Sequence, residues 1–306
     1  MSLPDVFWSF LAACFLAALC AHRLCARLPR RHATNRAHVV FQDVIRYGKT
    51  KQRPHGDARL RAFDVPKRWF WHFYAISVVW NGLLLALYLN FSFQQQSLPS
   101  WLNAVLDFLT AAPASRVPQL STLLLQLLLC LHSLRRLLEC LLVSVFSDGA
   151  LHLMQYAFGV GYYVALGWTV LCCDRLGKGT GPLLSQLDWS HVVGTVLFIG
   201  ASVMQHQSTV QLAGLRTGKS GVVETLAHKM PAGGWFELVS CPHYLAELLI
   251  YVSLSVVLGG LSLTWWLVVV YVLFNQALAA QLCHDLYVSK FDSYPKHRKA
   301  FIPFVL

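Results

Sequence analysis

The chain has few charged residues. Asp, Glu, Lys and Arg make up 13% of its 306 residues, whereas a soluble domain carries about 25%. Hydrophobic residues account for 56% of the chain. This composition excludes an ordinary water-soluble domain and indicates a protein that is solvated mainly by lipid.

The chain also lacks the usual sequence signs of a metal site. No Cys-x-x-Cys pair occurs among its nine cysteines, although such pairs are common in zinc sites. We therefore predict no metal site. Most of the cysteines are interpreted as small apolar residues of membrane helices.

No complete nucleotide-binding motif is present either. Residues Ala213–Ser220 resemble a phosphate-binding loop, but Ala213 stands where that motif needs glycine, and no strand precedes it. Gly177–Gly181 lacks the strand–helix frame of a Rossmann fingerprint and is interpreted as a turn. A nicotinamide cofactor would therefore have to bind without that fold, with Arg216 and Lys219 meeting phosphates as side-chain cations.

What the chain does have is a series of apolar runs. A helix needs about 20 mostly apolar residues to span a bilayer. The candidate spans are Val6–Ala21, His72–Phe93, Leu120–Ser133, Ala150–Cys173, Trp189–Leu212, Tyr244–Leu258 and Leu263–Cys283. We predict an all-α, polytopic membrane protein with about seven transmembrane helices in one bundle.

Basic residues predict the orientation of this bundle. Twelve of the 25 Lys and Arg residues lie in Arg27–Arg68, and most of the others lie on connections predicted to share its side. Cytoplasmic loops are enriched in Lys and Arg, so the N-terminus is predicted to be lumenal and the C-terminus cytosolic. A basic cytosolic face favours anionic lipid or a phosphorylated cofactor as its partner, rather than nucleic acid.

The chain is interpreted as one domain overall. Residues 1–68 form the first transmembrane helix and a basic cytosolic loop, and residues 69–306 form the membrane bundle that carries the chemistry. The C-terminal half of this bundle is expected to bind a nucleotide. No obligate protein partner is evident.

The most informative single residue is Glu247, which lies inside an apolar run. A charged side chain at the centre of a membrane helix costs about 2.5–3.5 kcal/mol on insertion scales, so it usually faces a partner or a wet cavity. Glu247 is either a helix-end residue paired with Lys or His, or a functional carboxylate. Asn275, Gln276 and His284 on the next span favour function, because a carboxylate and amides can hold the carboxamide of a nicotinamide.

A polar stripe also interrupts the third span. His132, Arg135, Arg136 and Glu139 follow at i, i+3, i+4 and i+7, so they share one face of a helix. Such a stripe near a membrane core is costly unless something polar faces it, and it therefore indicates a buried charged ligand.

Two further sets of residues have alternative interpretations. His284 and Tyr287 are one helical turn apart and contact a cofactor, or else they anchor the helix at the lipid headgroups. The aromatic run Trp69–Tyr74 is typical of an interfacial belt.

Together these residues resemble the steroid 5α-reductase family over about residues 41–306. The resemblance rests on Phe41–Thr50, Ala62–Arg68, His72–Tyr74, Leu131–Arg136, Trp235–Glu237, Tyr244–Glu247 and the tail from His284 to Phe304. It implies a multi-pass enzyme of the endoplasmic reticulum membrane with cytosolic NADPH as cofactor. The implied reaction is reduction of the α,β double bond of polyprenal to dolichal, in dolichol synthesis for protein N-glycosylation, with a possible side activity on 3-oxo-4-ene steroids.

The resemblance also implies cofactor-binding residues. Glu247 matches the family carboxylate near the nicotinamide, and His284 with Tyr287 matches the His-x-x-Tyr of the last helix. The remaining cofactor-binding candidates are Arg136, Arg216, Lys229 (where relatives have arginine), His243 (where the branch has asparagine) and Asn275.

The chain departs from the family at the groups that polarise the carbonyl. Steroid-reducing relatives use a Glu and a Tyr, and Ala75 and Ser133 stand at these positions. The donor to the carbonyl oxygen is then another group, and the catalytic candidates are Tyr74, His72 and His132. The alternative class is a non-redox membrane protein, either a lipid transporter or a membrane methyltransferase.

Overall fold

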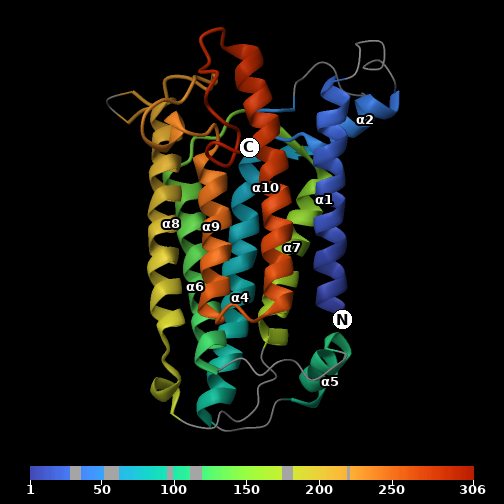
Figure 1. Ribbon diagram of the computed structural model, residues 1–306, viewed down its shortest axis with the longest axis vertical. Coiled ribbons are helices and arrows are strands. Elements are labelled where there is room, and N and C mark those ends of the chain that lie inside the picture. The colour runs from blue at the N-terminus through green and yellow to red at the C-terminus, as the bar shows by residue number, and fades with distance from the viewer. Residues whose placement is uncertain (28–35, 52–61, 95–98, 111–118, 174–181, 219–220) are drawn as a thin grey trace.

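The computed structural model describes residues 1–27, 36–51, 62–94, 99–110, 119–173, 182–218 and 221–306. Its long helices run side by side along the longest axis of the molecule (Figure 1). These helices are α1 (Leu3–Arg27), α4 (Phe70–Gln94), α6 (Gln119–Leu138), α7 (Leu153–Cys173), α8 (Trp189–Gly214), α9 (Pro242–Val257) and α10 (Leu263–Lys290). The shorter elements are α2 (Arg36–Ile45), α5 (Ser100–Leu109), η2 (Lys67–Trp69), η3 (Glu139–Val143), η4 (Leu183–Gln186) and η5 (Gly234–Glu237).

Each predicted span coincides with one of the long helices. Among the described residues, four segments are long and apolar enough to cross a membrane, and they correspond to α1, η2 with α4, α7 and α10. Helix α9 is apolar but shorter. The prediction of a mainly helical protein with several apolar helices long enough to span a membrane is thus confirmed. The number of seven spans and the orientation of the termini stay predictions.

Two parts of the fold differ from the sequence-based expectation. A two-stranded antiparallel sheet pairs β1 (Asp64–Pro66) with β2 (Ala150–His152), so the chain is not purely α-helical. The pairing explains why α7 begins at Leu153 and not at Ala150. Gly177–Gly181 and Lys219 lie outside the described residues.

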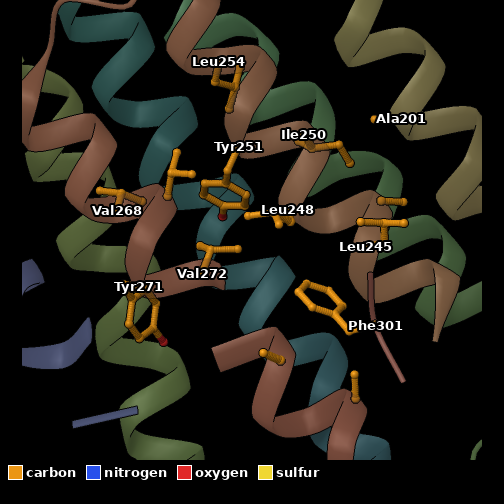
Figure 2. Packing of buried hydrophobic residues seen from close by; sticks show 14 of the residues in the cluster. Ala201, Leu245, Leu248, Ile250, Tyr251, Leu254, Val268, Tyr271, Val272 and Phe301 are labelled. Carbon is orange, nitrogen blue, oxygen red and sulfur yellow. The ribbon is translucent and has the colours of Figure 1, made fainter. Parts of the chain in front are cut away.

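The main apolar core lies between α1, α6, α7, α8, α9 and α10. Figure 2 shows its central layer, in which side chains from α9 and α10 point toward one another. Tyr251, Leu254 and Val268 are fully buried there, and Phe301 brings the C-terminal segment against the same core. Close packing of this kind holds the polar groups of neighbouring helices in fixed positions.

The C-terminal segment is also tied to the start of α9 by its backbone. Lys299 pairs with Val239 as an isolated parallel bridge. The amide of Ser240 donates to the carbonyl of Lys299 at 2.7 Å, and the amide of Lys299 donates to the carbonyl of Leu238 at 3.1 Å. The tail therefore lies over the end of the bundle where α9 begins and α10 ends.

Helices α8 and α9 approach very closely at Gly194. A Cβ atom at this position would lie 2.8 Å from the amide nitrogen of Val257 and 2.9 Å from the carbonyl oxygen of Ser253. Backbone atoms of a packed helix cannot move aside cheaply. The absence of a side chain at Gly194 therefore sets the distance between these two helices.

We expect Gly194→Ala to destabilise the bundle by about 1–3 kcal/mol, because the new methyl group forces α8 away from α9. The measurement is the midpoint of thermal unfolding in detergent. Gly200→Ala is the matched control, since Gly200 lies on the same helix and its Cβ would meet nothing within 4 Å. Equal midpoints for the two variants would contradict the proposed close approach.

Candidate active site

The polar stripe of α6 faces inward, as its spacing predicted. His132 is fully buried and Glu139 is 3% exposed. Glu139 begins a turn of π-helix that follows α6. π-turns frequently occur at functional sites, where they redirect side chains on a helix face.

Glu247 of α9 lies opposite this stripe. Its Oε1 atom is 3.3 Å from Nε2 of His132, close enough for an ion pair, although the two are not aligned as a hydrogen bond. Its Oε2 atom accepts a hydrogen bond of 2.5 Å from Nε2 of Gln205 on α8. The carboxylate that the sequence singled out is therefore buried and paired inside the bundle, which offsets the cost of placing it there.

Gln205 connects the three helices. Its amide nitrogen also donates to the carbonyl of His243 at 3.2 Å, and its carbonyl oxygen accepts from Nη2 of Arg135 at 2.5 Å. The sequence analysis missed Gln205. The signal was the polar sequence Gln205-His-Gln207 within the predicted span Trp189–Leu212, where an amide also has to find partners.

Glu139 is the second buried carboxylate of the network. It accepts from Arg135 at 2.6 Å and from His206 of α8 at 2.9 Å, and it also pairs with Arg136. The two arginines are therefore balanced by two carboxylates, Glu139 and Glu247. This balance keeps the helix end free of excess charge.

Tyr74 of α4 joins the same network. Nε of Arg136 donates to the Tyr74 hydroxyl oxygen at 3.4 Å, and the guanidinium carbon lies 5.2 Å from the centre of the tyrosine ring. Because Arg136 can only donate, the Tyr74 oxygen accepts, and its own proton remains available for another acceptor.

His72 lies apart from this network. Its Nδ1 atom is 2.9 Å from the hydroxyl of Tyr156, and its ring is flanked by Trp69 and Trp71. Of the three catalytic candidates, the structure thus connects Tyr74 and His132 with Glu247, and it places His72 in a separate aromatic cluster.

The remaining cofactor-binding candidates do not share one set of contacts. The ring of His243 is tilted by 49° against that of Tyr244, with 4.2 Å between centroids, and its Nδ1 atom is buried without a hydrogen-bond partner among the described residues. Asn275 donates to the Tyr271 hydroxyl at 3.1 Å, and among the described residues it makes no hydrogen bond to Glu247. Lys229 is exposed on the loop before η5.

Tyr287 belongs to a cluster that the sequence analysis only partly identified. Lys49 donates to its hydroxyl at 2.8 Å and lies 4.5 Å from the centre of its ring. Lys49 also lines a small cavity with Tyr47, Thr50, Lys67, Tyr244, Ala279, Leu282 and Cys283. Lys49 falls within the run Phe41–Thr50, which carries part of the family resemblance, but it was not named as a site residue.

Positive charge accumulates beside this cavity. Burial, together with the charges of the nearby Arg216, Lys49 and Lys290, lowers the pKa of His228 to about 4. Nε2 of His228 is buried without a hydrogen-bond partner among the described residues. Arg216 itself donates to the carbonyl of Val145 at 2.5 Å. An anion would relieve the repulsion among these cations.

His284 lies on the other side of this cluster. Its Nδ1 atom is 2.7 Å from the hydroxyl oxygen of Ser240, and its ring meets Tyr294 edge-on with 5.6 Å between centroids. Tyr294 in turn stacks on Tyr287, with 5.9 Å between centroids. His284 and Tyr287 thus share one cluster, as their spacing predicted.

An apolar groove of about 380 Å³ borders the network from outside. It is lined by Leu131, Leu134, Arg135, Leu138, Glu139, Leu142, Val143 and His206. Its leucines form a ridge along α6 and are strongly exposed, so in a membrane they would meet lipid.

Comparisons with known proteins show the family of the chain. Residues 154–306 match the family model for 3-oxo-5-alpha-steroid 4-dehydrogenase. The chain is 56% identical to a polyprenal reductase of Danio rerio over 310 residues, which cover 100% of this chain and 99% of the relative. It is 52% identical to that of Xenopus tropicalis over 314 residues, covering all of both chains. The polyprenal reductase of Homo sapiens is 53% identical over 274 residues, covering 87% of this chain and 86% of the relative.

We expect Glu139→Gln to destabilise the bundle by about 1–3 kcal/mol, because it leaves the half-buried Arg135 and Arg136 without their shared carboxylate. Thermal unfolding in detergent measures this loss. Glu224→Gln is the control, since Glu224 is exposed on a loop and its substitution should change stability by less than about 0.5 kcal/mol. A small effect at Glu139 would mean that the network is not needed for folding.

Proposed function

Because the chain belongs to the 3-oxo-5-alpha-steroid 4-dehydrogenase family, and is thus an oxidoreductase acting on a CH–CH group, we propose that it reduces the α,β double bond of polyprenal to give dolichal. NADPH is the proposed reductant, and the endoplasmic reticulum membrane is the proposed location. The names of the relatives favour this reaction over the transporter and methyltransferase alternatives.

One observation carries the proposal. Tyr74, a hydroxyl donor, and Glu247, the expected partner of the nicotinamide, lie on one continuous polar network inside an apolar bundle. The network runs from Tyr74 through Arg136, Glu139, Arg135 and Gln205 to Glu247. Substrate carbonyl and cofactor can therefore meet in a space from which bulk water is excluded.

The residues present fit a phosphorylated nicotinamide cofactor. Lys49 and Arg216 lie close enough to Lys67 for their positive charges to act on it. Lys49 and Lys67 both line the small cavity. The partnerless ring nitrogens of His228 and His243 are further polar groups that a ligand would satisfy. In this proposal the cations hold the phosphates, and Glu247 meets the carboxamide of the nicotinamide.

NADPH, when bound, would supply the hydride that adds to the β-carbon of the enal. Tyr74 then stabilises the negative charge that develops on the carbonyl oxygen, because its O–H is free to donate while Arg136 holds its oxygen. Addition of a proton at the α-carbon completes the saturated aldehyde. His132 orients Glu247 from the opposite side of the site.

The apolar groove between α6 and α8 is the proposed binding site of the isoprenoid tail. Arg135 and Glu139 belong to both the groove and the polar network, so an amphiphile lying there has its head beside the site and its tail toward lipid. Because the buried arginines are balanced by carboxylates, this position suits an uncharged aldehyde better than an anionic lipid headgroup.

The proposal predicts that the purified protein in liposomes oxidises NADPH with polyprenal and yields dolichal. Polyprenol is the control, because it lacks the carbonyl that accepts charge after hydride addition, and a 3-oxo-4-ene steroid tests the side activity. Glu247→Gln should abolish most turnover while the protein still inserts into the membrane. Failure of folded protein to oxidise NADPH with polyprenal would refute the proposal.

A second experiment distinguishes the two candidate donors to the carbonyl. Tyr74→Phe should lower kcat by about 10²–10³, the usual loss when one oxyanion donor is removed. His72→Gln should lower it by less than tenfold, since His72 bonds Tyr156 outside the network. The measurement is the rate of dolichal formation at saturating NADPH. The reverse order of effects would assign the donor to His72.

A further inference from the structure

Ser240 holds His284 in an unusually crowded polar contact. This serine precedes α9 and is fully buried. Its Oγ atom lies 2.7 Å from Nδ1 of His284, 2.5 Å from the hydroxyl of Tyr294 and 3.1 Å from the carbonyl oxygen of Lys299. Three polar neighbours compete for one hydroxyl group.

A count of protons and lone pairs gives the direction of each bond. A serine hydroxyl has one proton and two lone pairs. The Lys299 carbonyl can only accept, so Ser240 donates its proton there. Both remaining neighbours must then donate to Ser240, which requires a proton on Nδ1 of His284. This is the arrangement in which all three contacts are hydrogen bonds.

Arg298 lies beside the tyrosine. Its guanidinium carbon is 5.2 Å from the centre of the Tyr294 ring. Because Ser240 gives its only proton to the Lys299 carbonyl, the Tyr294 hydroxyl donates its own proton to Ser240. Arg298 is 2% exposed and is itself held by the carbonyl of Pro231 at 2.8 Å.

The consequence concerns the other ring nitrogen of His284. In a neutral imidazole with a proton on Nδ1, Nε2 carries a lone pair and can only accept a hydrogen bond. His284 is partly exposed, so this atom can meet a ligand. A histidine in the other tautomer would present a donor at the same place.

We propose that Ser240 is a positioning residue that holds His284 in its Nδ1–H tautomer, so that Nε2 accepts a hydrogen bond from an N–H or O–H group of the bound nicotinamide cofactor. The cofactor has such N–H and O–H donors at its carboxamide nitrogen and its ribose hydroxyls. The inference rests on the proposed function, in which His284 contacts the cofactor. It assigns Ser240 and the C-terminal segment a part in cofactor recognition.

The test is a double-mutant cycle on NADPH affinity, measured by fluorescence titration of the full-length protein in detergent. Ser240→Ala should weaken NADPH binding about tenfold, because Nδ1 loses its acceptor and the tautomers mix. In the His284→Ala background the same substitution should have no further effect, since the residue that it positions is absent. Ser240→Thr retains the hydroxyl and should restore binding to within about threefold of the original affinity.

Ser253→Ala is the matched control for loss of a buried hydroxyl. Ser253 is fully buried on α9 and donates to the carbonyl of Ile250 at 2.6 Å. We expect its substitution to leave NADPH affinity unchanged. Thermal midpoints of all variants establish that each one is folded at the temperature of the titration.

The outcomes separate this inference from the proposed function. If Ser240→Ala lowers NADPH affinity equally with and without His284, the inference is overturned, because equal losses of affinity indicate a general packing effect. Unchanged affinity in His284→Ala overturns it as well. Absence of NADPH binding by the unsubstituted, folded protein refutes the proposed function itself.

Discussion

The arrangement of this bundle depends on the need to pair charges inside an apolar bundle. Helix α6 and the π-turn that follows it bring His132, Arg135, Arg136 and Glu139 into an apolar environment, where each lone charge is costly. Gln205 and His206 of α8 and Glu247 of α9 provide the partners. Because each of these contacts requires a particular height along the helix, the network fixes the register of α6, α8 and α9 as well as the site.

The charges are divided between two regions with different requirements. Inside the bundle, two arginines face two carboxylates, which suits chemistry on an uncharged aldehyde. Near the cavity that Lys49 and Lys67 line, cations depress the pKa of His228, which suits the phosphates of a cofactor. Tyr244 lines this cavity and stands one helical turn before Glu247, so the two regions are adjacent along α9.

The sequence predicted those parts of the structure that depend on periodicity and on the cost of buried charge. The long helices and the inward-facing stripe of α6 follow from these two signals. Gln205 was missed because it is one of three glutamines in α8, with Gln207 and Gln211, and their spacing does not single it out. Lys49 was missed because a loop residue has no periodic pattern to place it. His72 and Tyr74 are two residues apart on α4, so they point to different faces of the helix. Which of the two faces α6 depends on how α4 rotates against α6 and α7. Side-chain packing determines that rotation, and local sequence does not reveal it.

The same packing explains how the chain accommodates its departure from the family pattern. The family resemblance predicts that Ser133 replaces the tyrosine donor of steroid-reducing relatives. Its hydroxyl lies 2.7 Å from that of Ser77 on α4. Ser133 also donates to the carbonyl of Leu129 at 2.9 Å, so its polar atoms are satisfied within the seam between α4 and α6. It therefore has no free proton for a substrate. Tyr74, one turn before Ser77 on the same helix, extends past this seam to Arg136, which favours it as the group that replaces the missing tyrosine.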